Sequence, residues 1–226
     1  AVKAELGNNF LGPAEWKRGF GVDVGEVPPI PALITKSLLE SECPLHPGAQ
    51  IKDTHILVLM PKTVDGKAYT ALKLDEMCAT RKGSGDKLIY DGWNKWKSMP
   101  WAKAQQPSSE WVLIPKLDPD PRWVSEDKHF RDKNIAQQQQ VHDTYYPEYR
   151  EAKALEVMTA ALLNDLVHGG PRMLGEEGYG GYRPYLRCEE PNASGGRVCV
   201  GSFVAYGLLV LDAFDDGADA YPGIGR

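Results

Sequence analysis

The sequence predicts an α+β fold that is rich in loops, with small antiparallel sheets and one long helix. Two short apolar runs, residues 55–60 (HILVLM) and 111–114 (WVLI), have the length and the bounded ends of buried strands. Across residues 149–167, apolar side chains recur at spacings of three and four, as on the buried face of a helix. No linker-like stretch divides residues 1–226, so a single domain is the simplest organisation.

The first part of the chain is interrupted by many glycines and prolines. Residues 1–31 carry short apolar groups separated by these residues, which predicts an extended N-terminal arm. A short helix is expected within the arm at 13–17, because proline is tolerated in a first helical turn. Residues 32–42 predict another short helix, which the turn sequence CPLHPG would end. Asp-Gly at the centre of VDGK, residues 64–67, predicts a tight turn.

Three tryptophans, Trp93, Trp96 and Trp101, lie between the two predicted strands. Aromatic side chains bury a large apolar area, so tryptophans spaced in this way usually pack a long loop onto the core. We favour that interpretation. A platform on which a sugar stacks is the alternative.

The long helix has a clear end, and a hairpin is expected after it. His168 falls in the last turn, where a cation would suit the carbonyl end of a helix. Gly169, Gly170 and Pro171 follow it and would stop the helix. Farther on, LRCEEPNASGGRVCVGSF predicts a β-hairpin that turns at residues 192–196.

Composition and charge exclude some classes of partner. The net charge of −5 and the isoelectric point near 5.6 disfavour a general electrostatic attraction to nucleic acid or anionic lipid. No apolar run approaches the roughly 20 residues of a membrane span, so membrane insertion is not expected. The first residues, AVKAELGNNF, show no signal peptide. The oligomeric state stays open.

The four cysteines allow three pairings, and the sequence selects none of them. In a chain of this length we expect buried thiols rather than a disulfide framework. A pairing across the predicted hairpin, between the third and fourth cysteines, is the alternative. The four residues are Cys43, Cys78, Cys188 and Cys199.

No motif in the chain has the specificity of a catalytic or metal-binding signature. Cys43, His46 and His55 could begin a metal site. Zinc sites normally have two close pairs of ligands in the sequence, and the second pair is missing here. Ser202 lacks the GxSxG surroundings of a serine nucleophile. We therefore expect no catalytic residue, no metal and no cofactor, and a protein that is not an enzyme.

The C-terminal segment lacks five residue types. Lys, Glu, Gln, Met and Trp number 49 in the whole chain, and all of them fall at or before Glu190. At that frequency about eight would be expected in residues 191–226. Charge cannot explain the absence, because Asp and Arg are still used there. When asparagine codons are randomised at both adenines, these same five types are the ones that cannot be encoded. The composition therefore indicates adenine-directed diversification.

The end of the chain resembles a variable protein of a diversity-generating retroelement. In that family a strand like G-G-S-F opens the diversified segment, and a strand like G-I-G-x-R closes it. Residues 201–203 (GSF) and 223–226 (GIGR) match these two strands. The resemblance implies a C-type-lectin fold related to formylglycine-generating enzymes, with residues 191–226 as the variable region.

A longer similarity covers other parts of the chain. The runs GPAEWKRGFGVDVGEVPPIP, CPLHPGAQIKDTHILVLMPKTVDGK, WVLIPK and YLRCEE are similar to an uncharacterised bacterial family. Members of that family end in a similarly hypervariable tail and have no assigned activity. This similarity therefore supports the architecture more than the function.

The retroelement resemblance implies a ligand-binding display protein whose target is a protein or a cell-surface molecule, with a virion tail or a cell surface as its location. Strand alternation would then turn Leu208 and Val210 into the core and Leu209 and Leu211 outward. Phe214 would be an aromatic contact of the kind that dominates binding surfaces, as would Tyr221. The expected binding residues are Tyr206, Leu209, Leu211, Asp212, Ala213, Phe214, Asp215, Asp216, Ala218, Asp219 and Tyr221.

Two other functions remain as alternatives at this stage. The first is an interaction or effector module of the uncharacterised family, with a tail that is not diversified. The second is a formylglycine-generating-type oxidoreductase, which shares the fold and needs a pair of cysteines to bind copper. Cys188 and Cys199 would have to be that pair, although no further motif supports them.

Overall fold

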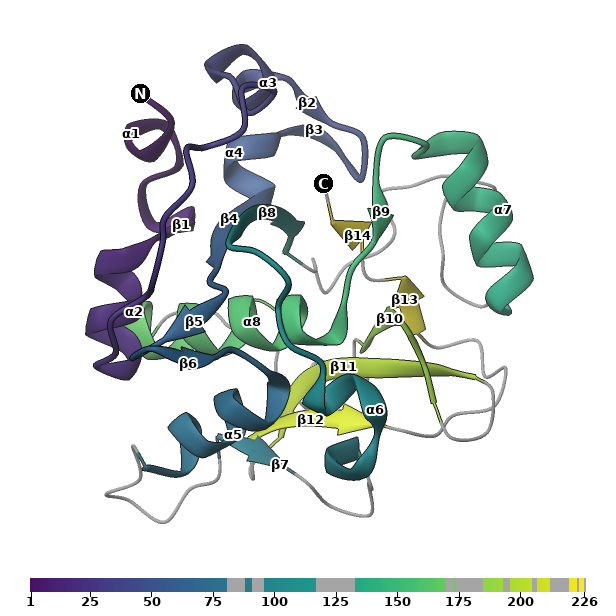
Figure 1. The fold of residues 1–226 in the computed structure, drawn as a ribbon. Helices are drawn as coiled ribbons and strands as arrows, with labels where there is room; N and C mark the ends of the chain where they lie inside the picture. Colours follow the sequence, from purple (N-terminus) through teal and green to yellow (C-terminus); the bar gives the residue numbers. More distant parts are fainter. Residues whose placement is uncertain are drawn as a thin grey trace.

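The protein is an α+β structure in which two sheets enclose one long helix (Figure 1). The helix, α8 (Ala154–His168), contacts β1, β4 and β8 of one sheet and β10 and β11 of the other. The computed structural model describes residues 1–80, 88–90, 96–116, 133–169, 173, 185–192, 196–204, 207–211, 220–222 and 224–225.

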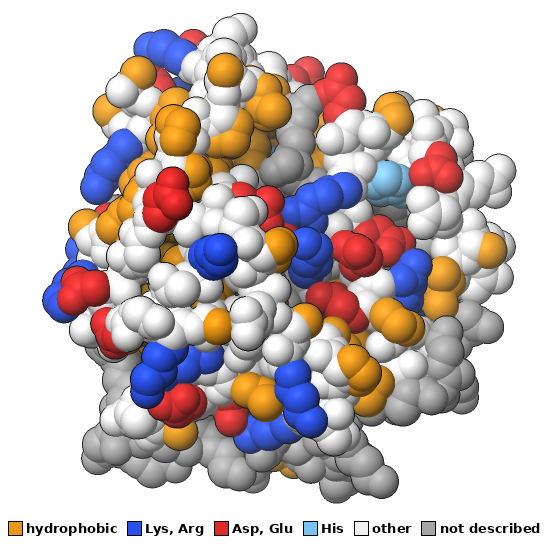
Figure 2. Space-filling view, viewed as in Figure 1, with side chains coloured by type: hydrophobic (Ala, Val, Ile, Leu, Met, Phe, Trp, Pro, Cys, Tyr) orange, Lys and Arg blue, Asp and Glu red, His pale blue; other side chains and the backbone are white. Residues whose placement is uncertain are grey.

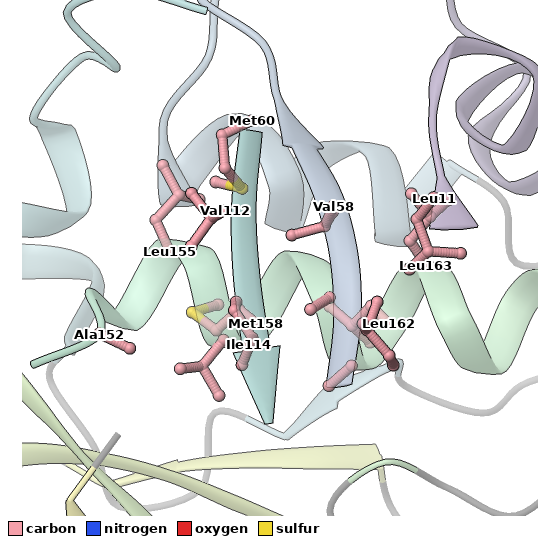
Figure 3. Close-up of a cluster of buried hydrophobic side chains, with 14 of the residues drawn as sticks. Leu11, Val58, Met60, Val112, Ile114, Ala152, Leu155, Met158, Leu162 and Leu163 are labelled. Atoms are coloured by element: carbon pink, nitrogen blue, oxygen red, sulfur yellow. The ribbon is translucent and has the colours of Figure 1, made fainter. Parts of the chain in front are cut away.

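Helix α8 is the centre of the hydrophobic core. Eleven of its fifteen residues are buried, and they are the consecutive residues Ala154 to Asn164, which make three whole turns. Figure 3 shows Met158 and Leu162 of the helix facing Val58 and Ile114 of the first sheet. A helix buried on all sides must be apolar nearly all round, as this one is.

The sequence predicted this helix and its end but placed its start too early. α8 begins at Ala154, because the Glu156 carboxylate accepts a hydrogen bond from the backbone N–H of Lys153 (2.9 Å) and so closes the first turn. Tyr149, which the prediction included, lies outside the helix and packs against His55 instead. At the other end Gly169 has a φ of 56°, the left-handed conformation that ends many helices.

The first sheet has the order β1-β4-β8. Its central strand, β4 (His55–Met60), is buried at every residue, which confirms the prediction of a strand covered on both faces. Strand β1 (Phe10–Leu11) runs parallel to it, and β8 (Glu110–Pro115) runs antiparallel and confirms the second predicted strand.

Strands β5 (Thr63–Val64) and β6 (Lys67–Ala68) form a short hairpin with a two-residue loop. Asp65 and Gly66 have φ angles of 47° and 73°, which a tight hairpin turn of this kind requires. The predicted VDGK turn is confirmed.

The short helix expected at 13–17 is present as α2 (Pro13–Phe20), but the extended arm expected around it is wrong for residues 2–11. Residues 2–20 contain α1, a 3₁₀ turn, β1 and α2, and the buried Trp16 anchors them by donating from Nε1 to the carbonyl of Leu59 (2.9 Å). Gly19 lies so close to Leu163 that an added Cβ would come within 2.5 Å of its Cδ1. The arm is therefore part of the packed framework, because its helix lies directly on α8.

The remaining short elements of the first half surround this core. The short helix predicted at 32–42 is present as α3. The elements are α1 (Val2–Leu6), η1 (Gly7–Asn9), α3 (Lys36–Glu40), β2 (Glu42–Cys43), β3 (His46–Gln50), α4 (Ile51–Thr54), α5 (Ala71–Thr80), η2 (Trp96–Ser98) and α6 (Pro100–Lys103).

Two of the three tryptophans pack on the core, as we expected. Trp96 is fully buried, and Trp101 is partly buried against the same hydrophobic cluster. Their rings stack with centroids 5.7 Å apart. Trp93 lies outside the described residues.

The second sheet has five strands in the order β13-β10-β11-β12-β7. Its central pairs are antiparallel, and an edge strand is added in parallel on each side, β13 beside β10 and β7 beside β12. The strands are β7 (Ile89–Tyr90), β10 (Tyr185–Pro191), β11 (Arg197–Val204), β12 (Gly207–Leu211) and β13 (Ala220–Pro222).

The predicted hairpin is the central pair of this sheet. Strands β10 and β11 are antiparallel, and the N–H of Gly196 donates to the Asn192 side-chain oxygen (2.7 Å) where the chain turns. Beyond this sheet, β9 (Arg150–Glu151) pairs with β14 (Ile224–Gly225), and α7 (Ile135–Tyr145) is a helix that the sequence analysis did not predict.

Candidate functional site

Most of the expected binding residues lie outside the described residues. Leu209 is fully described, and Leu211 and Tyr221 are placed only by the backbone of β12 and β13. Those outside are Tyr206, Asp212, Ala213, Phe214, Asp215, Asp216, Ala218 and Asp219.

The prediction that one face of β12 is buried is correct, but the prediction that its other face is exposed is wrong at Leu209. Leu208 and Val210 are fully buried in the cluster around α8, as expected. Leu209 is 6% exposed, so the expectation that it points to solvent is wrong. Strand β12 lies inside the sheet, between β11 and β7, and its second face is covered as well as its first.

The second face also carries a buried arginine. In the strand register Arg187 is opposite Cys199, and Gly201, two residues farther along β11, is opposite Leu209, so Arg187 and Cys199 share the face that carries Leu209. Arg187 is 7% exposed and Cys199 is 5% exposed. This face is therefore an interior layer of the protein where it is described.

Helix α7 contacts this layer at Arg187. Gln138 of α7 accepts a hydrogen bond from Arg187 Nη1 (2.5 Å), and both side chains are buried. A buried guanidinium needs acceptors to replace the water it has lost. Burial raises the pKa of the neighbouring Cys199 thiol, although Arg187 acts in the opposite direction.

A histidine lies one helical turn beyond Gln138. His142 Nδ1 is 3.1 Å from Asp143 Oδ1, and its Nε2 is buried with no hydrogen-bond partner in the described part of the chain. The hydrogen bond from His142 is the main cause of the lowered pKa of Asp143. His142, Gln138 and Arg187 together make the polar part of this interior layer.

Sequence reasoning missed this layer because α7 has almost no apolar periodicity. A signal for its start was nevertheless present. Asn134 and Gln137 form a capping box, in which each side chain accepts from the backbone N–H of the other residue (2.9 Å each). Asn followed three residues later by Gln is a recognisable sequence signature of a helix start.

The strands of the C-terminal segment attach to the framework at separate places. Strand β12 and strand β13 bracket residues 212–219 and lie in one sheet, with β11 and β10 between them. Tyr221 is opposite Leu186 in the register of β13 and β10. Strand β14 lies within the GIGR segment, residues 223–226, and pairs with β9.

The four cysteine thiols are buried and free, as expected. Cys188 belongs to the cluster around α8, whereas Cys199 lies on the opposite face of the sheet. The alternative pairing across the hairpin is therefore wrong, because Arg187 rather than Cys188 is opposite Cys199.

The other candidate ligands have internal partners. His55 is fully buried, with Nδ1 2.9 Å from Thr54 Oγ1 and Nε2 3.3 Å from the Tyr149 hydroxyl. His46 Nε2 lies 3.3 Å from the carbonyl of Lys116. In the described residues, no three His, Cys, Asp or Glu side chains come together as a group that could hold a metal ion.

Comparisons with protein-family models, with curated proteins and with solved structures gave no match to this chain. Among the helices of the described residues, none combines the length and the apolar character needed to cross a membrane.

Proposed function

We propose that this chain is a ligand-binding display protein with a C-type-lectin-like fold, in which a retroelement diversifies residues 191–226. The tail would bind a protein or a cell-surface molecule. The residues that vary would be those in and around 212–219, together with outward positions on the adjoining strands.

The observation that carries this proposal is the absence of Lys, Glu, Gln, Met and Trp after Glu190. The change in composition falls at the end of β10, the first strand of the central hairpin. Before that point the chain supplies α8, the first sheet and β10, all of which make up the framework. After it, the chain supplies β11, β12, β13 and β14.

The sheet topology supports the proposal. Residues 212–219 start from β12 and end at β13, and two other strands separate these ends. Binding residues carried between strands of a rigid sheet can change while the backbone stays in place. The matched end motifs also lie on strands, with residues 201–203 on β11 and 224–225 on β14.

The same structure limits which tail positions can vary freely. Leu208 and Val210 fill the core beside α8, so polar substitutions there would unfold the protein. Leu209 is buried as well, and it is therefore removed from the set of freely variable surface positions.

The encoding locus tests the proposal. We expect a reverse-transcriptase gene nearby, and a near-copy of the 3′ end that differs from it mainly at adenines. Sister copies of the gene should differ between the codons for residues 191 and 226 and agree elsewhere. If both elements are absent and sister copies differ evenly along their length, the proposal fails, and an undiversified interaction module is the better interpretation.

A further inference from the structure

Charged side chains from several elements meet where the C-terminal segment joins the framework. Arg150 of β9 donates to Glu156 of α8 through Nη1 (2.9 Å) and Nη2 (2.6 Å). Glu156 is fully buried. The backbone of Arg150 pairs with Gly225 of β14, so this ion pair lies directly beside the last strand. Figure 2 shows acidic and basic side chains gathered on this face, over the region of β9 and β10.

Glu190 lies at the same place, near the end of β10. Its Oε2 accepts a hydrogen bond from the backbone N–H of Ala154 (2.8 Å), in the first turn of α8. This contact joins the last residue before the segment of restricted composition to the central helix. It replaces one of the hydrogen bonds that the start of a helix cannot make internally.

The groups around Glu190 do not favour a negative charge. The Glu156 carboxylate of α8 and the Glu189 carboxylate of the same strand both repel it, and the Cys188 thiol is close enough to interact with it. Arg150 is bound to Glu156, while Arg197 of β11 donates to the carbonyl of Glu189 and lies 3.4 Å from the Glu151 carboxylate. Both arginines therefore already have partners, and the ionised Glu190 would be a partly buried charge among other carboxylates.

We propose that Glu190 is a positioning residue that holds the base of the variable tail against α8, and that this attachment is most stable while its carboxyl group is neutral. Neutralising the group removes a partly buried charge and its repulsion from Glu156 and Glu189, and these gains outweigh the weaker hydrogen bond that a neutral oxygen accepts from Ala154. The inference rests on the proposed function only in treating the attached segment as a variable tail. The contact itself belongs to the framework.

The electrostatics give the direction of the pH dependence. Burial, followed by the neighbouring carboxylates, raises the pKa of Glu190 from 4.5 to about 7, against the opposing hydrogen bond from Ala154. The folded state therefore holds the proton more strongly than an opened state does. This contribution to stability is complete below about pH 4.5 and is lost as the pH rises through about 7.

Hydrogen exchange of the backbone amides in β9, β10 and β14 tests the proposal without any ligand. After correction for the intrinsic effect of pH on exchange, these amides should exchange about tenfold faster at pH 8 than at pH 6. At pH 6 the opening of this region must release the Glu190 proton, whereas at pH 8 Glu190 is already ionised and opening is easier. Glu190→Gln keeps the shape and the acceptor but cannot ionise, so its corrected rates should be the same at both pH values. Glu26→Gln is the control at an exposed carboxylate outside this region, and it should keep the tenfold difference.

Two results would overturn the proposal. One is a wild-type protein with equal corrected rates at both pH values, and this result needs no variant. The other is a Glu190→Gln variant that retains the wild-type difference. Either result leaves the proposed function standing, because the gene locus and the sister copies are examined separately. In the same way, a locus that lacks the reverse-transcriptase gene and the near-copy would leave the exchange result unaffected.

Discussion

Helix α8 packs on one face of the five-stranded sheet, whereas α7 contacts the opposite face through the hydrogen bond from Arg187 to Gln138. α8 has eleven of fifteen residues buried, most of them apolar, so the hydrophobic effect holds it. α7 has three of eleven buried, namely Gln138, Val141 and His142, so specific hydrogen bonds carry more of its attachment. The sheet therefore has one face packed closely on an apolar helix and one face that α7 contacts through a polar side chain.

This difference suits the proposed division of the protein. The α8 side contains the framework residues that must stay constant for the chain to fold. The α7 side contains Arg187, which pairs in register with Pro222 of the tail strand β13. Substitutions on the two sides should therefore have effects of different size and extent, and three of them test the comparison.

The largest effect is expected in α8. Leu162→Ala removes a fully buried side chain from the contact between the helix and the first sheet. Loss of its apolar area together with the cavity left behind should lower the free energy of unfolding by about 2–5 kcal/mol. Urea unfolding measures this change.

The matched control for this substitution is Leu33→Ala, since Leu33 is 61% exposed. It should change the unfolding free energy very little. Equal effects of the two substitutions would contradict the assignment of α8 as the centre of the core.

An intermediate and local effect is expected at the α7 contact. Gln138→Ala removes the acceptor of the Arg187 hydrogen bond and should cost about 1–3 kcal/mol, because a buried charged donor loses a partner. Hydrogen exchange should show faster opening of α7, while the amides of α8 keep their protection.

Gln140→Ala is the control, because Gln140 lies in the same helix and is exposed. It should leave the exchange of α7 nearly unchanged. If both glutamine substitutions open α7 equally, then the polar contact with Arg187 is not what holds the helix.

The smallest effect is expected at the start of α7. Asn134→Ala removes the side-chain oxygen that accepts from the N–H of Gln137, and such caps contribute about 1 kcal/mol. Circular dichroism during thermal unfolding should show an earlier loss of helix. Asn134→Asp keeps an acceptor and should restore the wild-type value, whereas failure of the aspartate to do so would argue against a capping role.

The parts of the fold predicted correctly are those with strong local patterns. The apolar runs that form β4 and β8 could hardly face solvent, and the spacing within α8 allows only a buried helix. The VDGK turn depends on an Asp-Gly pair that favours this backbone shape by itself.

The candidate site was predicted less well, because its outcome depends on neighbours distant in sequence. Alternation along β12 correctly separated Leu208 from Leu209, but it could not show that the second face is also covered. The polar sequence of α7 gave no reason to place it over Arg187, since that contact joins residues 49 positions apart.

The amino-acid sequence alone determined the local elements of this protein and the change in composition after Glu190. Those features depend on backbone preferences, on the spacing of apolar side chains and on the genetic code. Only the tertiary structure decided that β7 and β13 join the sheet edges in parallel, that Leu209 is buried, and that Glu190 meets the start of α8. These are pairings between distant segments, whose stability comes from mutual burial and hydrogen bonding and therefore leaves no pattern in any one stretch of sequence.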